Sequence, residues 1–452
     1  MEKLVIKLKQ HTPLIHFQHD QEGATLRASE VKPKLDRFIL SKLGEEHYDT
    51  ISDDEYEEVA SLFEKKSGKL FDDISRTSQE YEVGKYVASK KCWFSGDASH
   101  LSLNYKMKIF IENNSKRKEY LIASYLSSRD RERLENEGII PINNSPYFAQ
   151  EKENGEIIRS NNPTLKWNDI PKKGIIESGY IIIELYCFNK TIQKELISFI
   201  AESIQAFFLS TNFGTRQSKG FGSLTVNEII KNNVRLEKKD DEELLKNLFS
   251  FVYKRNSHNS DLRIIFKGIS EDYRLIKSGV NFPQRGIYNK SKLMEYARSN
   301  GIRWEKRFIK KCFNEKTDNN YILRSEHEAA NLPQRGEDYE YIRVVLGLAE
   351  QFEFILSNPP QGNSKMVVKI SNPTIERYQS PLLFKVINNN IYLVGTNVNP
   401  DILGKSFDFL MSIQNDNLWR EHVTINTPKV FNLKSFIHFA MKDDKLNYIK
   451  LK

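Results

Sequence analysis

The sequence predicts an α+β protein of two tandem ferredoxin-like domains, each with large insertions. Apolar periodicity in the N-terminal half runs strand, helix, hairpin, long polar insertion, strand, helix and strand, the order of an elaborated ferredoxin-like unit. A charged run at residues 231–243 interrupts this pattern and is typical of a boundary. A second series of strand and helix patterns follows. We therefore expect an N-terminal domain at residues 1–236 and a C-terminal domain at residues 237–452.

Composition indicates a folded protein with a mild preference for polyanions. The 452 residues are enough for two hydrophobic cores, and 39% of them are hydrophobic. Lysine and arginine (68) exceed aspartate and glutamate (60), which gives a net charge of +8. No apolar run reaches the length of a membrane span, and Met1 leads into a strand pattern rather than a signal peptide, so we expect a cytoplasmic protein. The cysteines, Cys92, Cys187 and Cys312, have neither disulfide parity nor metal-ligand spacing, and no cofactor is expected.

The elements of the N-terminal domain follow from the spacing of apolar side chains. Alternation predicts strands at 4–8, 101–111, 119–126, 175–188 and from 224 onward, with the second and third strands forming a hairpin, and 3.6-residue periodicity predicts helices at 30–42 and 191–209. Acidic residues between 45 and 58 predict a solvated helix face. Residues 141–173 are rich in Asn, Pro, Gly and Lys and predict a long surface excursion.

The C-terminal domain has weaker signals. They predict a strand at 366–370, a hairpin of 381–387 with 391–394, and a helix at 401–413. This order is consistent with a second ferredoxin-like domain.

Residues 211–223, between the second helix and the last strand of the N-terminal domain, carry the clearest functional signal. This glycine loop contains three glycines and a series of donors: Gly214, Arg216, Gln217, Ser218, Lys219, Gly220, Phe221, Gly222 and Ser223. Glycines allow positive φ angles and close backbone approach, while guanidinium and N–H groups seek phosphate oxygens. Phe221, between two glycines, could stack on a base. The loop therefore predicts contact with a sugar-phosphate backbone; a helix C-cap followed by a turn is the alternative.

Two further basic features suit nucleic acid. Residues 281–286 and 331–336 share the pattern Asn-x-Pro-Gln-Arg-Gly, which presents Arg285 and Arg335 as candidate phosphate clamps or is simply a repeated turn. Between them, residues 303–311 place cations on one side of a helix and aromatic residues on the other. A basic face flanked by aromatics fits nucleic acid; the alternative is that this is only the solvated face of an ordinary amphipathic helix.

His16 and His19 form the one histidine cluster with possible chemistry. Pro13 before them and Gly23 after them predict a loop rather than a helix that would bring both rings to one face. No Glu-x-x-His pattern or cysteine pair lies nearby, which argues against a metal site. A role as acid or base and a role as a loop contact both stay open.

Three sets of segments resemble the RAMP superfamily of CRISPR-associated proteins. Residues 214–222 are similar to its glycine-rich loop, G-x-R-x-S-x-G-[FY]-G, which precedes the last strand of an RRM-like RAMP domain. Residues 12–14 and 26–38 resemble the opening of Cmr-type RAMP subunits, with Ser29 as the expected helix cap. Residues 343–348 and 376–386 are similar to segments of the subunit family that caps type III-B Cmr effector complexes at the guide 3′ end.

This resemblance implies a non-catalytic RNA-binding subunit of a type III CRISPR (Cmr-type) effector complex, acting in antiviral defence. Such a subunit would contact guide (CRISPR) RNA and target RNA near the guide 3′ end, beside other RAMP subunits. The rival function is a RAMP endoribonuclease that processes CRISPR precursor RNA by metal-independent attack of a 2′-hydroxyl, with His16 or His19 as acid or base. A free-standing binder of single-stranded RNA is a third possibility.

The resemblance also implies where RNA would lie. In the family the start of the first helix lies beside the glycine loop, so Arg27, Lys34 and Arg37 are expected to extend the loop into one positive groove. The expected RNA-binding residues are Arg27, Lys34, Arg37, Gly214, Arg216, Gln217, Ser218, Lys219, Gly220, Phe221, Gly222, Arg285, Arg335 and Arg377.

Overall fold

The computed structural model describes residues 1–15, 25–96, 101–123, 128–143, 152–153, 156–157, 173–257, 259–282, 287–316, 339–356, 365–414 and 416–452. The chain divides into two compact units. The N-terminal unit comprises residues 1–267 and 384–392, and the C-terminal unit comprises residues 268–383 and 393–452. Among the described residues, no helix combines the length and the apolar character needed to cross a bilayer.

The N-terminal unit is built on an antiparallel sheet with the strand order β11, β10, β1, β9, β3. These strands are β1 (Glu2–Gln10), β3 (Lys106–Ile111), β9 (Ile181–Cys187), β10 (Leu224–Lys231) and β11 (Val234–Leu236). In the central strand β1, Leu4, Ile6 and Leu8 are fully buried. Side chains alternate across a strand, so this spacing buries one face of the sheet.

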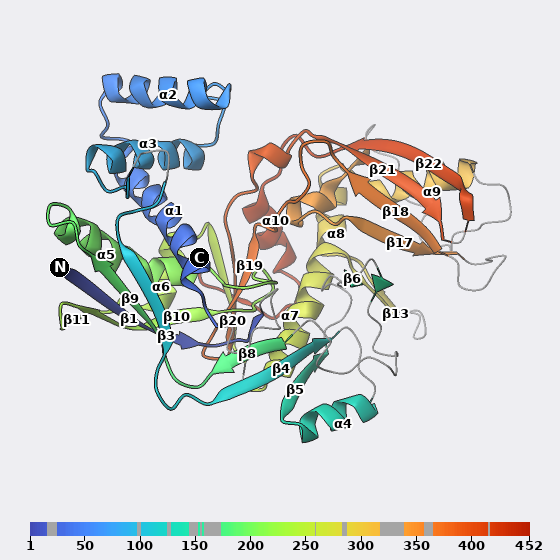
Figure 1. Ribbon diagram of the computed structural model, residues 1–452. Helices are drawn as coiled ribbons and strands as arrows, with labels where there is room; N and C mark the ends of the chain where they lie inside the picture. The colour runs from blue at the N-terminus through green and yellow to red at the C-terminus, as the bar shows by residue number, and fades with distance from the viewer. Residues whose placement is uncertain are drawn as a thin grey trace. The chain divides into compact units, whose positions relative to one another are not determined.

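Two helices cover that buried face (Figure 1). They are α1 (Ala28–His47), which follows β1, and α5 (Gln193–Ser210), which lies between β9 and β10. Val31 and Leu35 of α1 share one hydrophobic core with Ile200 of α5 and with the sheet. The chain order β1, α1, β3, β9, α5, β10 follows the predicted order, except that the predicted hairpin contributes only one strand, β3, to this sheet. Helix α1 is longer than the predicted span of 30–42.

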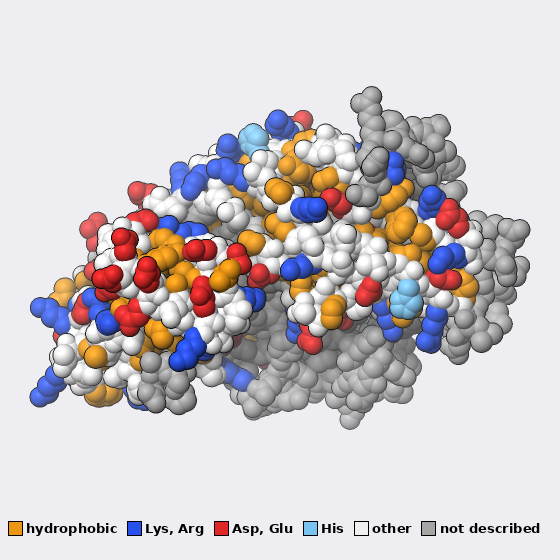
Figure 2. Space-filling model, turned by 90° about the horizontal axis from the view of Figure 1, so that it is seen from above, with side chains coloured by type: hydrophobic (Ala, Val, Ile, Leu, Met, Phe, Trp, Pro, Cys, Tyr) orange, Lys and Arg blue, Asp and Glu red, His pale blue; other side chains and the backbone are white. Residues whose placement is uncertain are grey.

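The first insertion is a pair of helices, α2 (Asp53–Ser67) and α3 (Arg76–Lys90). A capping box of Ser52 and Glu55 begins α2, and Val59 and Phe71 belong to a small core of their own. The acidic side chains of α2 at positions 53–55, 57 and 58 are exposed. Figure 2 shows Asp and Glu side chains gathered over this part of the unit, which confirms the predicted solvated face.

The second insertion is a small sheet with the strand order β2, β8, β4, β5. Its elements are β2 (Leu14–Ile15), β4 (Arg117–Ala123), α4 (Ser128–Asn136), β5 (Ile139–Asn143) and β8 (Lys173–Glu177); β6 (Lys152–Glu153) and β7 (Glu156–Ile157) form a separate pair. The prediction that β3 and β4 form a hairpin is wrong. They belong to different sheets, because β3 pairs with β9 whereas β4 pairs with β5 and β8.

The charged run at 231–243 is folded structure rather than a linker. Asn232 and Asn233, both at positive φ, turn β10 into β11, and α6 (Asp241–Leu248) follows. Gln205 of α5 ties this segment down, since its Nε2 donates to the carbonyl oxygen of Lys239 (2.7 Å) and to Asp241 Oδ1 (2.8 Å). The division between the two units therefore falls at residue 267, not after residue 236.

Three more strands and a helix lie around this division. They are β12 (Phe251–Arg255), α7 (Leu262–Lys277), β19 (Leu382–Ile387) and β20 (Asn390–Gly395), with β20 placed between β19 and β12. The predicted hairpin of β19 and β20 is confirmed. Asn388 and Asn389 form its turn at φ angles of 46° and 69°, which Asn tolerates better than most residues.

The C-terminal unit is built on a six-stranded sheet with the order β15, β16, β22, β21, β18, β17. These strands are β15 (Arg303–Trp304), β16 (Tyr339–Glu340), β17 (Gln351–Ile355), β18 (Lys365–Ser371), β21 (Ser406–Ile413) and β22 (Asp416–Asn426). The other elements are β13 (Val280–Phe282), β14 (Ile287–Asn289), α8 (Lys292–Ser299), α9 (Glu305–Lys316), η3 (Ile342–Leu346), η4 (Pro400–Ile402), α10 (Leu433–Ala440) and β23 (Ile449–Lys450).

The helix predicted at 401–413 is wrong. Phe407, Phe409, Met411 and Ile413 are buried at every second position, which is the period of a strand, and the segment forms β21. The predicted strand at 366–370 is confirmed as β18.

Candidate nucleic-acid interface

The glycine loop connects α5 to β10 and has a buried inner half and a partly exposed outer half. Residues 220–223 are buried, whereas residues 214–219 are half-buried. Phe221 is 0% exposed and stacks on Phe266 of α7, with ring centroids 3.9 Å apart and planes 11° from parallel. The prediction that Phe221 stacks on a base is therefore wrong, because its ring is buried in the core and is already stacked on Phe266.

Two glycines of the loop are required by close backbone approach. At Gly222 (φ +66°) a Cβ atom would lie 1.9 Å from the carbonyl oxygen of Phe213. At Gly214 (φ +76°) a Cβ atom would lie 2.4 Å from the carbonyl oxygen of Ile15. Contacts this short are impossible for a side chain, so the loop folds as it does only because both residues lack one.

Hydrogen bonds from the segment after β1 hold the buried half of the loop. The Thr12 hydroxyl donates to the carbonyl oxygen of Gly220 (2.7 Å) and accepts from the backbone N–H of Ser223 (2.8 Å). The backbone N–H of Gly222 donates to the carbonyl oxygen of Pro13 (2.9 Å). The loop is thus fixed against the end of the first strand.

Strand β19 holds the loop from the other side through a buried lysine. Lys385 is 0% exposed, and its Nζ donates to the carbonyl oxygens of Phe208 (2.6 Å) and Thr211 (2.9 Å) at the end of α5. Burial lowers the pKa of Lys385 to about 7. The backbone N–H of Phe384 also donates to the carbonyl oxygen of Ser218 (3.2 Å). The bonds of Lys385 fix the position at which the loop leaves α5. The bond from Phe384 fixes the position of Ser218 in the outer half.

The outer half of the loop lies beside the start of α1, as predicted. The backbone N–H of Gly214 donates to Glu30 Oε1 (2.7 Å), and the same carboxylate oxygen accepts from Lys34 Nζ (3.2 Å). Lys34 Nζ also lies 5.0 Å from the ring centroid of Phe213 in the loop. Glu30 thus links the loop to a cation on the next turn of α1.

The other cations of α1 are placed differently. Arg27 is the N-cap residue and is half-buried. Arg37 is exposed, and its guanidinium lies 5.2 Å from the ring of Tyr81 on α3, so it packs toward the first insertion. Ser29 does not cap the helix, contrary to expectation, because the helix begins at Ala28 and Ser29 is inside its first turn.

The side chain of Gln217 forms its hydrogen bond within the loop. Its Nε2 donates to the carbonyl oxygen of Gly214 (2.6 Å), which closes the half-exposed turn. The backbone carbonyl of Gln217 accepts from the side chain of Asn212 (2.7 Å). Arg216 adopts a positive φ of 58° between these contacts. The turn that carries Arg216 and Lys219, both half-buried, is therefore pre-formed.

Several predicted site residues cannot be placed in this interface. His16, His19, Arg285 and Arg335 lie outside the described residues. Arg377 is exposed in the loop between β18 and β19 and belongs to the C-terminal unit.

The family-like segment at 343–348 has a structural place in the C-terminal unit. Arg343 is buried on η3 and donates through Nε to the buried carboxylate of Glu305. Lys277 donates to the carbonyl oxygens of Leu346 (3.3 Å) and Gly347 (2.6 Å), and burial beside the charge of Arg343 lowers its pKa to about 7. Lys277 thus holds the turn after η3, whereas Arg343 joins η3 to the start of α9.

Sequence reasoning missed Thr12, Glu30 and Lys385 as supports of the loop. Thr12 and Glu30 occur in the RAMP-like opening, but nothing in the sequence indicated which partners they contact. Lys385 interrupts the apolar run of β19, and this charge inside a buried strand was the available signal.

Comparisons with known proteins decide the family. The family model "Cmr1 N-terminal domain" matches residues 1–280, and "Cmr1 C-terminal domain" matches residues 288–450. The chain belongs to the Cmr1 family. It is a Cmr1-like subunit of the type III-B CRISPR class.

Solved structures similar to this Cmr1-like chain are distant in sequence. One is a chain of the cryo-EM structure of the type III-B Cmr-beta bound to cognate target RNA, with 11% identity, a TM-score of 0.40, and 99% of each chain covered. Another comes from the same complex with target RNA and AMPPnP, in state 2, in the presence of ssDNA, with 12% identity, a TM-score of 0.38, and 98% of each chain covered. No curated protein matches the chain.

Proposed function

We propose that this Cmr1-like protein is a non-catalytic RNA-binding subunit of a type III-B Cmr effector complex, contacting guide and target RNA near the guide 3′ end. One observation carries the proposal: the hydrogen bond from Gly214 to Glu30 joins the outer half of the glycine loop to the cationic start of α1. Arg27, Lys34, Arg216 and Lys219 belong to these two joined segments.

The arrangement favours the RNA backbone over the bases. Guanidinium and ammonium groups bind phosphate without regard to sequence. Both aromatic rings of the loop, Phe213 and Phe221, are buried. A guide-programmed complex must accept any spacer sequence, so contacts of this kind suit the subunit. The pre-formed turn lowers the entropic cost of holding RNA.

The strand order supports a RAMP-type domain. In the N-terminal unit, β10, β1, β9 and β3 are neighbours, and the chain runs β1, α1, β3, β9, α5, β10. We assign this unit to the ferredoxin-like fold on that basis. The glycine loop then precedes the last strand of the fold, as in RAMP proteins. Other RAMP subunits of the complex are the proposed protein partners.

A binding experiment tests the proposal. Filter binding of the full chain to single-stranded RNAs of unrelated sequence would be measured over a salt series. Arg216→Ala with Lys219→Ala should weaken binding of all the RNAs about equally and reduce the salt slope by about 0.7 for each phosphate that the loop no longer neutralises. The control is Lys65→Ala with Lys66→Ala, which removes the same charge from exposed residues of α2. Equal slopes for the two double variants would contradict the proposed interface.

A further inference from the structure

The central sheet of the N-terminal unit has an outer face, opposite the one that α1 and α5 cover. Side chains alternate across a strand, so Lys3, Val5 and Lys7 of β1 lie on this outer face, between the buried residues of the same strand. The register places Lys3 beside Tyr186 of β9, and Tyr186 beside Lys106 of β3. These five side chains are half-buried or exposed, so the described part of the chain leaves this face open to solvent.

Two aromatic rings stand side by side at one end of the outer face. Tyr186 and Phe188, the residue that follows β9, are two positions apart and so point to the same side of the sheet. Their ring centroids are 6.4 Å apart, and their planes are 17° from parallel. Phenylalanine is usually buried, yet Phe188 is 63% exposed. Exposed, nearly parallel rings of this kind are a platform on which a base can stack.

The outer face also carries more cations than carboxylates. Lys3 pairs with Glu184 (2.8 Å) and Lys7 pairs with Glu228 (2.8 Å). Lys106 and Lys108, on the edge strand β3, are exposed, and neither forms a salt bridge with a residue that the structure describes. In all, six cations share this face with three carboxylates: Lys3, Lys7, Lys9, Lys106, Lys108 and Arg235 against Glu112, Glu184 and Glu228.

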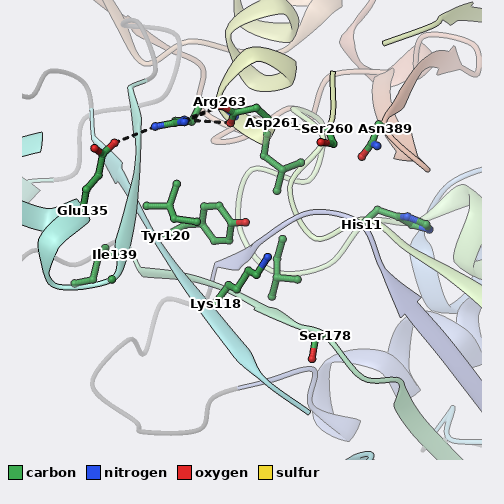
Figure 3. A pocket seen from close by; sticks show the side chains of 14 residues that line it. His11, Lys118, Tyr120, Glu135, Ile139, Ser178, Ser260, Asp261, Arg263 and Asn389 are labelled. Atoms are coloured by element: carbon green, nitrogen blue, oxygen red, sulfur yellow. Dashed lines mark hydrogen bonds and ion pairs between the residues drawn. The ribbon is translucent and has the colours of Figure 1, made fainter. Parts of the chain in front are cut away.

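The surplus of positive charge distinguishes this face from the cavity of the same unit. That cavity has a volume of about 610 Å³ and is lined by residues of β4, β5, β8 and the start of α7 (Figure 3). Its lining holds two cations, Lys118 and Arg263, and two carboxylates, and Arg263 pairs with both Asp261 (2.8 Å) and Glu135 (2.9 Å). The cavity is therefore electrically balanced, and a polyanion is attracted to the sheet face instead.

We infer that the outer face of the central sheet binds single-stranded RNA as a second contact surface of this subunit, an inference that rests on the proposed function. Bases stack on Phe188 and Tyr186, while the lysines of β1 and β3 neutralise the phosphates between them. The RNA is single-stranded because the bases of a duplex are stacked on one another and present no free face. Every base has such a face, so this contact accepts any sequence.

This surface is separate from the glycine loop. The loop enters β10 at Leu224, which pairs with Gln10 at the far end of β1, whereas the aromatic pair lies beside Lys3. Lys3 and Gln10 are seven residues apart, which corresponds to roughly 23 Å along a strand. Substitutions at the two surfaces therefore have independent effects on RNA affinity.

Binding measurements on the full chain test the stacking and the phosphate contacts separately. An unstructured RNA and an abasic ribose-phosphate oligomer of the same length would be titrated by fluorescence anisotropy over a salt series. Phe188→Leu keeps an apolar side chain but removes the ring, and Phe188→Trp enlarges the ring; both change an exposed side chain. Lys106→Gln with Lys108→Gln removes two charges from the face, and Lys65→Gln with Lys66→Gln, on the exposed side of α2, is the matched control.

Phe188→Leu should weaken RNA binding about tenfold at every salt concentration, because one stacked base is lost, and should leave the affinity for the abasic oligomer unchanged. Phe188→Trp should bind RNA at least as tightly as the wild type. Lys106→Gln with Lys108→Gln should reduce the salt slope for both ligands by about 0.7 for each phosphate that is no longer neutralised. The control on α2 should leave both slopes unchanged.

The inference is overturned if Phe188→Leu binds RNA as the wild type does, or if it weakens binding of the abasic oligomer equally. If RNA affinity is unchanged but the sheet variants no longer enter a reconstituted Cmr complex, the face docks a protein and the inference is likewise overturned. RNA binding that depends on Arg216 and Lys219 but not on the sheet variants would contradict this inference alone. Absence of RNA binding by the wild type would contradict the proposed function as well.

Discussion

Lys385 offers a direct test of how the glycine loop is held. Its buried Nζ donates to two carbonyl oxygens at the end of α5, and burial lowers its pKa from 10.5 to about 7. In the folded protein the amine is therefore mostly neutral above pH 7, whereas in the unfolded chain it stays protonated up to pH 10.5. The unfolded state binds more protons in this window, so the stability contributed by Lys385 rises with pH there.

The magnitude follows from this difference in proton binding. Each pH unit between about 7 and 10 should add up to about 1.4 kcal/mol to the free energy of unfolding through this one group. Lys385→Met removes the titration and leaves two buried carbonyl oxygens without donors, at a cost of about 1–3 kcal/mol each. The wild type should therefore gain stability relative to the variant as pH rises through this window.

Urea unfolding of both proteins at pH 6, 7, 8 and 9 measures the difference. Lys66→Met, on an exposed lysine of α2, controls for loss of charge. The expected result is a difference between wild type and Lys385→Met that is smallest at pH 6 and grows at pH 8 and 9. A difference that is constant with pH, or that shrinks, would refute the buried neutral amine.

Three further predictions concern the loop, the helix and the chemistry. Gly222→Ala should destabilise the protein by well over the roughly 1 kcal/mol expected of Gly68→Ala, because both glycines have positive φ but only at Gly222 would the new Cβ atom overlap backbone, and thermal unfolding of the two variants compares them. Arg27→Gln should lower RNA affinity in filter binding, because Arg27 precedes the helix that Glu30 joins to the glycine loop; unchanged RNA affinity together with a large drop in the unfolding midpoint would show that Arg27 is structural. The purified protein should leave a CRISPR repeat hairpin and a complementary target RNA uncut, with or without divalent metal; a cut on a denaturing gel that disappears in His16→Ala or His19→Ala would favour the endoribonuclease.

The sequence predicted most of the central sheet because its signals are local. Leu4, Ile6 and Leu8 alternate over a strand that is buried on one face, and α1 and α5 have clear apolar stripes. The hairpin at Asn388 and Asn389 was equally predictable, since few residues other than Asn and Gly accept positive φ in a two-residue turn.

What could not be predicted depends on contacts between distant segments. Phe221 between two glycines looked exposed, but Phe266, forty-five residues later in the sequence, covers it. Lys385 supports a loop more than 160 residues earlier, and no local pattern indicates such a pairing. In β21 the apolar side chains of Phe407, Phe409 and Met411 occupy every second position, which is the period of a strand. This signal was present in the sequence, although a helix was predicted.

The measurement closest to the central claim is photo-crosslinking in a reconstituted Cmr complex containing this subunit. Guide RNAs carrying 4-thiouridine at single positions along their length would be irradiated, and crosslinked peptides identified by mass spectrometry. The account predicts crosslinks to residues 214–219 and to the start of α1 from the positions nearest the guide 3′ end, and weaker ones after Arg216→Ala with Lys219→Ala. Crosslinks that come instead from the 5′ end, or that leave this region of the subunit unlabelled, would contradict it.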